Sequence, residues 1–401
     1  MTSPFPSKEQ VFDFLDDYAY QRKEEIDRRQ LGKDQGLIKS YLLETMPGNP
    51  ERGTGMDLPV VLRGTGWQIV PIEDTALYQV YDGEGELGFL EPLSSRHLAL
   101  HSISETRRAD KAVRNTVLAT SQLDFAWLSS SYFQVLWQHL ILPQMPKRFI
   151  KLRFEHEARF EADSWDGRRE KSLEEPMERR ASSLTITERS HKVAQFLPDL
   201  QRVHPPFRVI KMLRIPAPEV RGGYDLWSWG KMTYRAPSFR DGRAQMLSIA
   251  RLYERTTQVI EQLLWFQVER IKGKEGSEGM TLRGAPVTFT FTPPLSITAF
   301  RNFVTTTFER GQGPLRLWGN PIWRGDKKVH IYGMDLHLWR RIYLEITPRQ
   351  MRVILPRGTC GNTVHRLVVN VLRYLTPTAQ VFIGEAEYER LIEKALLGED
   401  I

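Results

Sequence analysis

The chain has 401 residues, of which 41% are hydrophobic and 10% aromatic, and it carries a net charge of +7. A chain of this length and composition can bury a large core, which excludes a disordered protein and predicts two or three folded domains. Cys360 is the only cysteine, which excludes an internal disulfide framework or a multi-thiolate zinc site and is typical of a reducing compartment.

No part of the sequence indicates targeting to a membrane. No run approaches the ~20 apolar residues that a membrane-spanning helix needs. The N-terminal segment contains Asp13, Asp16 and Asp17, whereas secretory and transit peptides are poor in acids. These features predict a cytoplasmic protein without a membrane partner.

The first predicted domain, residues 1 to 145, mixes helices and strands. Apolar residues at helical spacing predict an amphipathic helix over residues 8 to 31 and a second, short helix over 35 to 45. Alternating segments predict three strands before residue 92, and residues 108 to 140 are predicted to be helical. His97 and His101 lie four residues apart, but no HExxH pattern is present, so a structural role is favoured over metal binding.

The second predicted domain, residues 146 to 272, is rich in strands. Residues 148 to 161 alternate between apolar and charged side chains, which predicts a half-buried antiparallel strand with Glu155 and Glu157 on its solvated face. Residues 163 to 182 are highly charged and indicate an insertion. Apolar positions spaced by three and four predict one long helix over residues 244 to 272.

Aromatic and basic residues alternate between residues 221 and 240. Trp227, Trp229 and Tyr234 are interleaved with Lys231 and Arg235, a mixture that nucleic-acid-binding surfaces use to stack bases beside cations. Aromatic residues are also common in strands, where they pack into the core. A twisted hairpin with buried aromatic side chains is the favoured interpretation.

The third predicted domain, residues 287 to 401, combines two main helices with several antiparallel strands and ends in an acidic tail. The whole chain is therefore predicted to have an α+β fold, with mostly antiparallel sheets packed against helices. Residues 286 to 375 contain thirteen Arg or Lys residues and four acids. This excess predicts a basic surface for a polyanion.

The most site-like segment is residues 349 to 375, which reads as a strand, a glycine-containing turn and a helix. Free N–H groups at the start of such a helix suit a phosphate group. The predicted anion-binding loop consists of Arg357, Gly358, Thr359, Gly361 and Asn362. The predicted electrostatic contacts around it are Arg316, Arg324, Lys327, Lys328, Arg340, Arg341 and Arg352.

Two residue pairs offer an enzymatic alternative. Cys360 near the helix start and Arg357 would have a lowered pKa and could be a nucleophile with His365 as base, although no orienting acid or amide is identifiable. Asp335 and His337 could form a base pair or half of a metal site, but a hydrogen-bonded structural pair is the favoured interpretation.

The sequence thus predicts a non-enzymatic nucleic-acid-binding protein, a subunit of an intracellular complex, and it does not distinguish DNA from RNA. One alternative is an interaction protein whose basic domain docks on an acidic protein. Another is an enzyme that acts on a phosphorylated or nucleic-acid substrate. The common nucleotide-binding, hydrolase and zinc motifs are absent, so no cofactor or metal is predicted.

Overall fold

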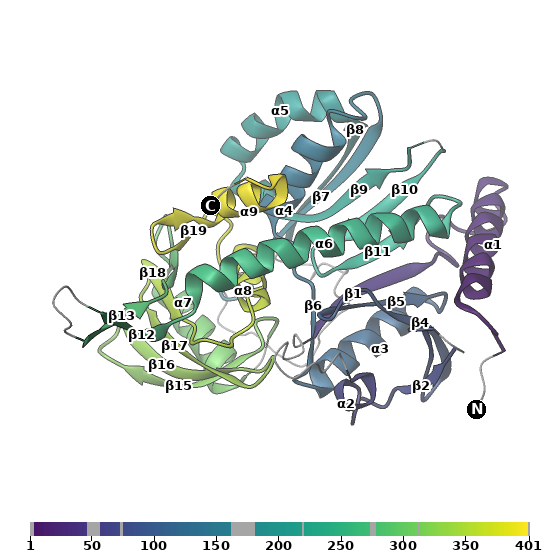
Figure 1. Ribbon diagram of the computed structural model, residues 1–401. Helices are drawn as coiled ribbons and strands as arrows, with labels where there is room; N and C mark the ends of the chain where they lie inside the picture. The colour runs from purple at the N-terminus through teal and green to yellow at the C-terminus, as the bar shows by residue number, and fades with distance from the viewer. Residues whose placement is uncertain are drawn as a thin grey trace.

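The computed structural model describes residues 4–45, 57–72, 75–161, 181–218, 220–272, 278–311 and 313–399. The protein has the predicted α+β fold, in which helices pack on two antiparallel sheets (Figure 1). The predicted charged insertion lies almost entirely outside the described residues. No helix in the described ranges combines the length and the hydrophobicity required to cross a membrane.

The larger sheet runs in the order β2-β3-β4-β5-β1-β11-β10-β9-β7-β8, and β6 also pairs with β1. It contains strands from both of the first two predicted domains. Its strands are β1 (Lys39–Thr45), β2 (Gln68–Pro71), β3 (Tyr78–Asp82), β4 (Gly85–Pro92), β5 (His97–Ser102), β6 (Leu123–Phe125), β7 (Phe149–Glu157), β8 (Ala181–Arg189), β9 (Ile210–Pro216), β10 (Gly223–Trp227) and β11 (Lys231–Tyr234).

The smaller sheet runs in the order β15-β16-β17-β18-β14-β19-β20. A separate two-stranded hairpin, β12 (Gln267–Lys272) and β13 (Glu278–Arg283), precedes it in the chain. The strands of the smaller sheet are β14 (Val287–Thr290), β15 (Leu317–Trp323), β16 (Val329–Asp335), β17 (Arg340–Ile346), β18 (Gln350–Ile354), β19 (Gln380–Ile383) and β20 (Ala386–Glu387).

Helices cover one face of the smaller sheet and parts of both faces of the larger sheet (Figure 1). The α-helices are α1 (Lys8–Asp27), α2 (Leu58–Val61), α3 (Thr106–Ala119), α4 (Ser130–Val135), α5 (Ser190–Val203), α6 (Phe239–Leu264), α7 (Ile297–Val304), α8 (Asn362–Tyr374) and α9 (Tyr388–Leu397). π-helical turns cover Leu136–Ile141 and Thr305–Glu309, and a 3₁₀ turn covers Pro205–Arg208.

The prediction of a short helix over residues 35 to 45 is wrong, because Lys39–Thr45 forms strand β1. All seven residues of β1 are buried, and the strand pairs with β5 on one side and β11 on the other. A strand that is buried on both faces lacks the alternation of a half-exposed strand, so hydrophobic periodicity does not separate it from a buried helix.

The helix predicted over residues 108 to 140 is interrupted. Strand β6 (Leu123–Phe125) separates α3 from α4 and pairs with β1. This short pairing brings residue Asp124 into the interior, where it becomes important for the buried charges described below.

Helix α6 is the longest helix of the described chain, but it begins and ends earlier than predicted. The Ser238 hydroxyl accepts a hydrogen bond of 3.1 Å from the Asp241 N–H, which caps the first turn. The helix ends at Leu264, and residues 267 to 272, which were predicted to be helical, form strand β12 instead.

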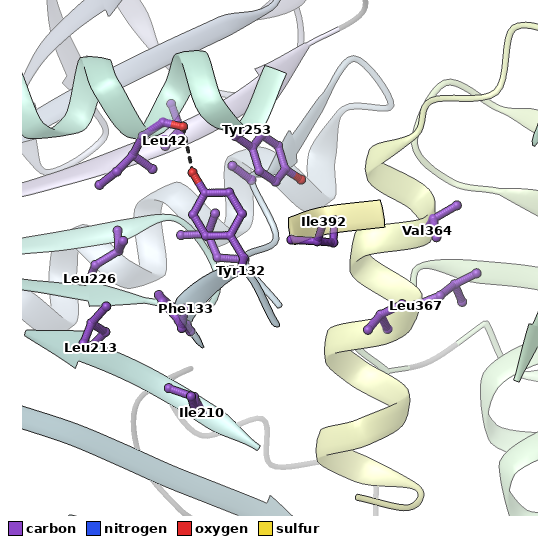
Figure 2. Close-up of a cluster of buried hydrophobic side chains, with 14 of the residues drawn as sticks. Leu42, Tyr132, Phe133, Ile210, Leu213, Leu226, Tyr253, Val364, Leu367 and Ile392 are labelled. Atoms are coloured by element: carbon purple, nitrogen blue, oxygen red, sulfur yellow. Dashed lines mark hydrogen bonds between the residues drawn. The ribbon is translucent and has the colours of Figure 1, made fainter. Parts of the chain in front are cut away.

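The main core joins α4, α6, α8 and α9 to the larger sheet. Figure 2 shows Leu213 and Leu226 of the sheet on one side of Tyr132 and Val364 of α8 on the other. The Tyr132 hydroxyl donates a hydrogen bond of 3.1 Å to the Ile249 carbonyl of α6. The elements around the C-terminal helices are therefore packed into the same core as the larger sheet.

Strand β7 confirms the predicted strand over residues 148 to 161, but its acidic residues are not solvated. Glu155 is fully buried, and it accepts hydrogen bonds from Lys211, at 2.5 Å, and from Arg373. Burial opposes ionisation of Glu155, but Arg373 and Lys211 outweigh it, so its pKa lies below the ordinary value. Glu155 is a structural anion of the interior.

Candidate nucleic-acid interface

The predicted anion-binding loop before α8 is turned into the protein. The Gly361 N–H donates 2.8 Å to a carboxylate oxygen of Glu261, and the Thr359 N–H donates 3.1 Å to the Pro356 carbonyl. Asn362 is fully buried and donates from its side chain to the Phe125 carbonyl at 3.0 Å. The Glu261 carboxylate therefore accepts the hydrogen bond from the Gly361 N–H group, which was predicted to bind phosphate.

Only two residues of that loop lie near solvent. Arg357 is exposed and Gly358 is half-buried, whereas Thr359, Gly361 and Asn362 are buried. The loop therefore provides a surface cation at Arg357 but no open cradle of N–H groups.

A buried ion cluster explains why the loop turns inward. Arg96 donates to Glu44 at 2.5 Å and to Glu261 at 2.6 Å, and the three side chains are almost inaccessible. Burial alone would lower the pKa of Arg96, but the adjacent Glu44 and Glu261 raise it above its usual value. The cluster joins β1, the loop before β5, α6 and the start of α8.

Cys360 belongs to this cluster, and its predicted reactivity is not supported. Its thiol donates to Glu44 at 3.0 Å, and it is buried. Burial and the charge of Glu44 raise the pKa of Cys360, which is the opposite of the predicted direction. A thiol in this state is a poor nucleophile at neutral pH.

Within the described residues, no hydrogen bond joins His365 to Cys360. The Nδ1 of His365 lies 2.7 Å from the Tyr388 hydroxyl of α9. Burial lowers the pKa of His365 to about 3. The structure therefore does not bring the predicted nucleophile and base together.

Asp335 and His337 form part of a second buried ion network. Asp335 accepts hydrogen bonds from Arg366 and Thr363 of α8, and the backbone N–H of His337 donates to Asp335 at 3.0 Å. Arg366 also donates to Asp124 of β6. Within the described residues, no group of three or more His, Cys, Asp or Glu side chains could hold a metal ion.

Arg316, a predicted phosphate contact, lies inside this second network. Its guanidinium donates 2.7 Å to the Leu123 carbonyl and lies 3.3 Å from Asp124. Only 7% of the residue is exposed. Arg316 therefore ties the smaller sheet to β6 and does not reach a ligand at the surface.

The other predicted cations lie along the smaller sheet. Arg324 and Lys327 are exposed in the turn between β15 and β16, and Lys328 beside them pairs with Glu345 at 2.7 Å. Arg341 and Arg352 are exposed on β17 and β18. The remaining residue, Arg340, is half-buried at the start of β17, close to Gly358.

Strands β15 to β18 have one buried face and one open face. Leu317, Ile331, Ile342 and Val353 point into the core, and the residues that alternate with them point outward. We call the outward side the open face. It comprises Trp318, Asn320, His330, Tyr332, Met334, Arg341, Tyr343, Glu345, Arg352 and Ile354.

Aromatic side chains gather at the centre of the open face. Tyr332 and Tyr343 are directly opposite each other on β16 and β17, and their ring centroids lie 5.6 Å apart in an edge-to-face arrangement. They are 59% and 37% exposed, and Trp318 on β15 is 51% exposed. These aromatic groups are accessible on a rigid sheet.

A shallow pocket of about 260 Å³ lies between these tyrosines and Arg352. Its acidic residue, Glu345, is held by Lys328 and by His330, whose Nε2 lies 3.2 Å from the carboxylate. The hydrogen bond from Lys328 keeps the pKa of Glu345 below its ordinary value. Arg352 therefore borders aromatic rings and a carboxylate that is already paired.

Arg341 and Arg352 were predicted from the sequence, whereas Trp318, Tyr332 and Tyr343 were not. Their signal is the alternation along residues 317 to 323, 329 to 335 and 340 to 346, in which an aromatic residue takes an outward position in each strand. The register that aligns these positions across the sheet is a tertiary property and was not visible in the sequence.

Comparison with known proteins gives a family but no activity. The chain is 22% identical over 396 residues to the uncharacterized protein MJECL33 of Methanocaldococcus jannaschii, and the match covers 87% of each chain. No solved structure matches the chain significantly. The model of the family described as MJECL33-like protein matches residues 1–390, and the chain therefore belongs to the MJECL33-like family.

Proposed function

We propose that the protein is a non-enzymatic nucleic-acid-binding protein that holds DNA or RNA on the open face of β15 to β18. The observation that carries the proposal is that exposed aromatic rings lie beside arginines on a sheet face where, among the described residues, the arginines form no ion pair and no helix covers them. Figure 1 shows β15, β16 and β17 at the lower left of the molecule, with α8 on the side toward α6.

The aromatic residues supply the stacking part of such a surface. A base that stacks on an aromatic side chain gains roughly 1–3 kcal/mol, and the gain depends little on base identity. Strand pairing fixes the backbone of Tyr332, Tyr343 and Trp318, so no backbone segment has to be ordered on binding. The exposed rings favour unpaired bases over a closed duplex.

The cations supply the electrostatic part. Arg341 and Arg352 lie on the open face, and no ion pair to either is formed among the described residues. Arg324 and Lys327 lie at the edge of the same sheet. Contacts from such side chains to phosphates release counterions, so binding should weaken steeply as salt is added.

The pair Cys360 and His365 gives no support to the enzymatic alternative. Cys360 is buried with a raised pKa, and His365 is hydrogen-bonded to Tyr388.

Exposed apolar residues support the further proposal that the protein is a subunit of a cytoplasmic complex. Val268, Met280 and Leu282 of the β12–β13 hairpin are 65%, 77% and 64% exposed. Val268 and Leu282 are opposite each other, which makes the apolar surface continuous. A protein partner would remove this surface from water.

The test is binding of labelled single- and double-stranded DNA and RNA, followed by fluorescence anisotropy across a salt series. The double variant Tyr332→Ala/Tyr343→Ala removes stacking, and Arg341→Glu/Arg352→Glu reverses the charge of the open face. Tyr20→Ala on α1 and Arg251→Glu on α6 are matched controls, because both residues are exposed far from this sheet in the chain.

We expect each double variant to weaken binding at least ~10-fold, since two stacked bases or two phosphate contacts are lost. The arginine reversal should also reduce the salt dependence, whereas the tyrosine variant should retain it. The controls should bind like the wild type. Absence of wild-type binding at low salt would overturn the proposal and favour an acidic protein as the partner of the basic surface.

A further inference from the structure

A second concave surface lies on the larger sheet, far along the chain from the open face. It is a pocket of about 230 Å³ on the side of the sheet that α3 covers in part. Lys151 and Arg153 of β7, Trp227 of β10 and Thr233 of β11 line it, together with Thr106 at the start of α3. The pocket therefore lies beside the N-terminal end of α3, over strands that this helix does not cover.

The sheet register places polar side chains in a row across this pocket. Lys151 is opposite Arg214, Arg214 is opposite Asp225, and Asp225 is opposite Thr233. Because neighbouring strands present directly opposed residues on the same face, these groups line one continuous surface. The position of each group is fixed by the backbone of four strands.

Asp225, the acid at the centre of the row, already has hydrogen-bond partners. Asp225 accepts hydrogen bonds from Arg214 at 2.5 and 2.9 Å and from Arg235 at 2.5 Å. It is almost completely buried. Asp225 therefore offsets part of the charge of Arg214 and Arg235, and Arg235 also pairs with Asp34, the second acid that lines the pocket.

Lys151 is the cation that remains. In the part of the chain that the structure describes, its ammonium group has no hydrogen-bond or ion-pair partner. Burial, together with the charges of Arg214 and Arg235, lowers its pKa even though Asp225 and Asp34 act in the opposite direction. A half-buried cation beside other cations is unfavourable in the empty protein and becomes favourable when an anion enters.

Arg153 provides a second donor next to an aromatic surface. Its guanidinium lies 5.9 Å from the centre of the Trp227 ring, and its contact with Glu155 is long, at 3.5 Å. Met212, directly opposite both Arg153 and Trp227, adds an apolar wall. The pocket thus combines cations and threonine hydroxyls with an apolar side.

We propose that this pocket binds a small phosphomonoester. Lys151 and Arg153 would bind the phosphate group, the hydroxyls of Thr106 and Thr233 would donate to its oxygens, and Trp227 and Met212 would contact the organic part. Lysine and arginine form strong, charge-assisted hydrogen bonds with phosphate. A volume of about 230 Å³ suits a small molecule and excludes a folded polymer.

The experiment is isothermal titration calorimetry of the full chain with AMP and ribose 5-phosphate, beside adenosine and ribose. Lys151→Gln removes the unpaired charge. Lys111→Gln is the control, because it removes the same charge from an exposed position on α3. Circular dichroism melting of both variants checks that they are folded.

We expect saturable binding of at least one phosphorylated probe and none of its unphosphorylated counterpart. Lys151→Gln should weaken that binding at least ~10-fold, since a charge-assisted contact is lost, and Lys111→Gln should leave it unchanged. The Tyr332→Ala/Tyr343→Ala variant should also bind the probe like the wild type, which separates this pocket from the open face. The proposal is wrong if neither phosphorylated probe binds or if Lys151→Gln binds as tightly as the wild type.

Discussion

The β10–β11 hairpin and the open face of β15 to β18 have similar residue types but opposite environments. In the hairpin, Trp229 is 1% exposed and Lys231 pairs with the buried Asp110 at 2.9 Å. On the open face, Trp318 is 51% exposed and Arg341 points to solvent. The sequence mixture of aromatic and basic residues is the same in both.

The difference arises from what lies over each sheet. Helix α3 places Ala109, Val113 and Val117 in the same apolar cluster as Trp227 and Trp229 of the hairpin. The open face has no such layer in the described structure, as Figure 1 illustrates. An aromatic-basic segment therefore indicates an extended binding surface only where no other element of the fold covers it, and under a covering helix it leaves room for a small pocket at most.

The largest expected effect tests this contrast directly. Trp229→Ala should destabilise the protein by about 3–5 kcal/mol, because it leaves a cavity in a closed cluster. Trp318→Ala should change the free energy of unfolding by only about 0.5 kcal/mol, as is usual for surface positions. Urea unfolding followed by tryptophan fluorescence or circular dichroism measures both. Equal losses would show that Trp318 is packed and not available for a ligand.

A smaller effect is expected for the arginines of the two regions. Arg235→Ala removes a donor from the buried Asp225 and should cost about 1.5–3 kcal/mol, the range for hydrogen bonds to charged groups. Arg341→Ala should cost no more than about 0.5 kcal/mol. The same urea titrations compare the two variants. A large loss for Arg341→Ala would mean that this residue serves stability.

The third expected effect, close in size to the second, depends on pH. His365 is buried, and because its pKa is lowered to about 3, protons bind the unfolded chain more readily than the folded chain below pH 6.5. The stability contribution of neutral His365 is therefore complete above pH 6.5 and is lost as the pH falls toward 3. From pH 7 to pH 5 it amounts to about 2 kcal/mol.

His365→Gln should remove this dependence, since glutamine does not titrate. Urea unfolding of the wild type and the variant at pH 7 and pH 5 gives the change in the free energy of unfolding with pH for each protein. The wild type should lose about 2 kcal/mol more than the variant over this interval. Parallel losses in the two proteins would show that His365 is not held in a neutral state.

The sequence predicted elements well where a single face is buried. The alternation of residues 148 to 161 and the helical spacing of residues 8 to 31 correspond to β7 and α1. Prediction failed at β1, because a strand buried on both faces has no alternation. Hydrophobic periodicity therefore identifies an element that buries one face, but it does not distinguish a helix from a strand when both faces are buried.

The candidate site was predicted only in part. Arg341 and Arg352 were included for their charge, but Arg316 has the same charge and lies in the interior with Asp124. Asp124 is about 190 residues away from Arg316 in the chain, and no local rule links the two. Ion pairs and strand register across such separations are set by the complete fold, so composition gave the basic character of the region but not its accessible side.

The second buried ion network, which contains Arg366 of α8, connects the two sheets. Asp124 belongs to the larger sheet and Asp335 to the smaller one, and Arg366 of α8 binds both. If the sheets separated, at least one of these buried charges would lose its partner, at a cost of several kcal/mol. Hinge motion between the sheets is therefore suppressed, and a ligand on either sheet meets a rigid frame whose parts should unfold together.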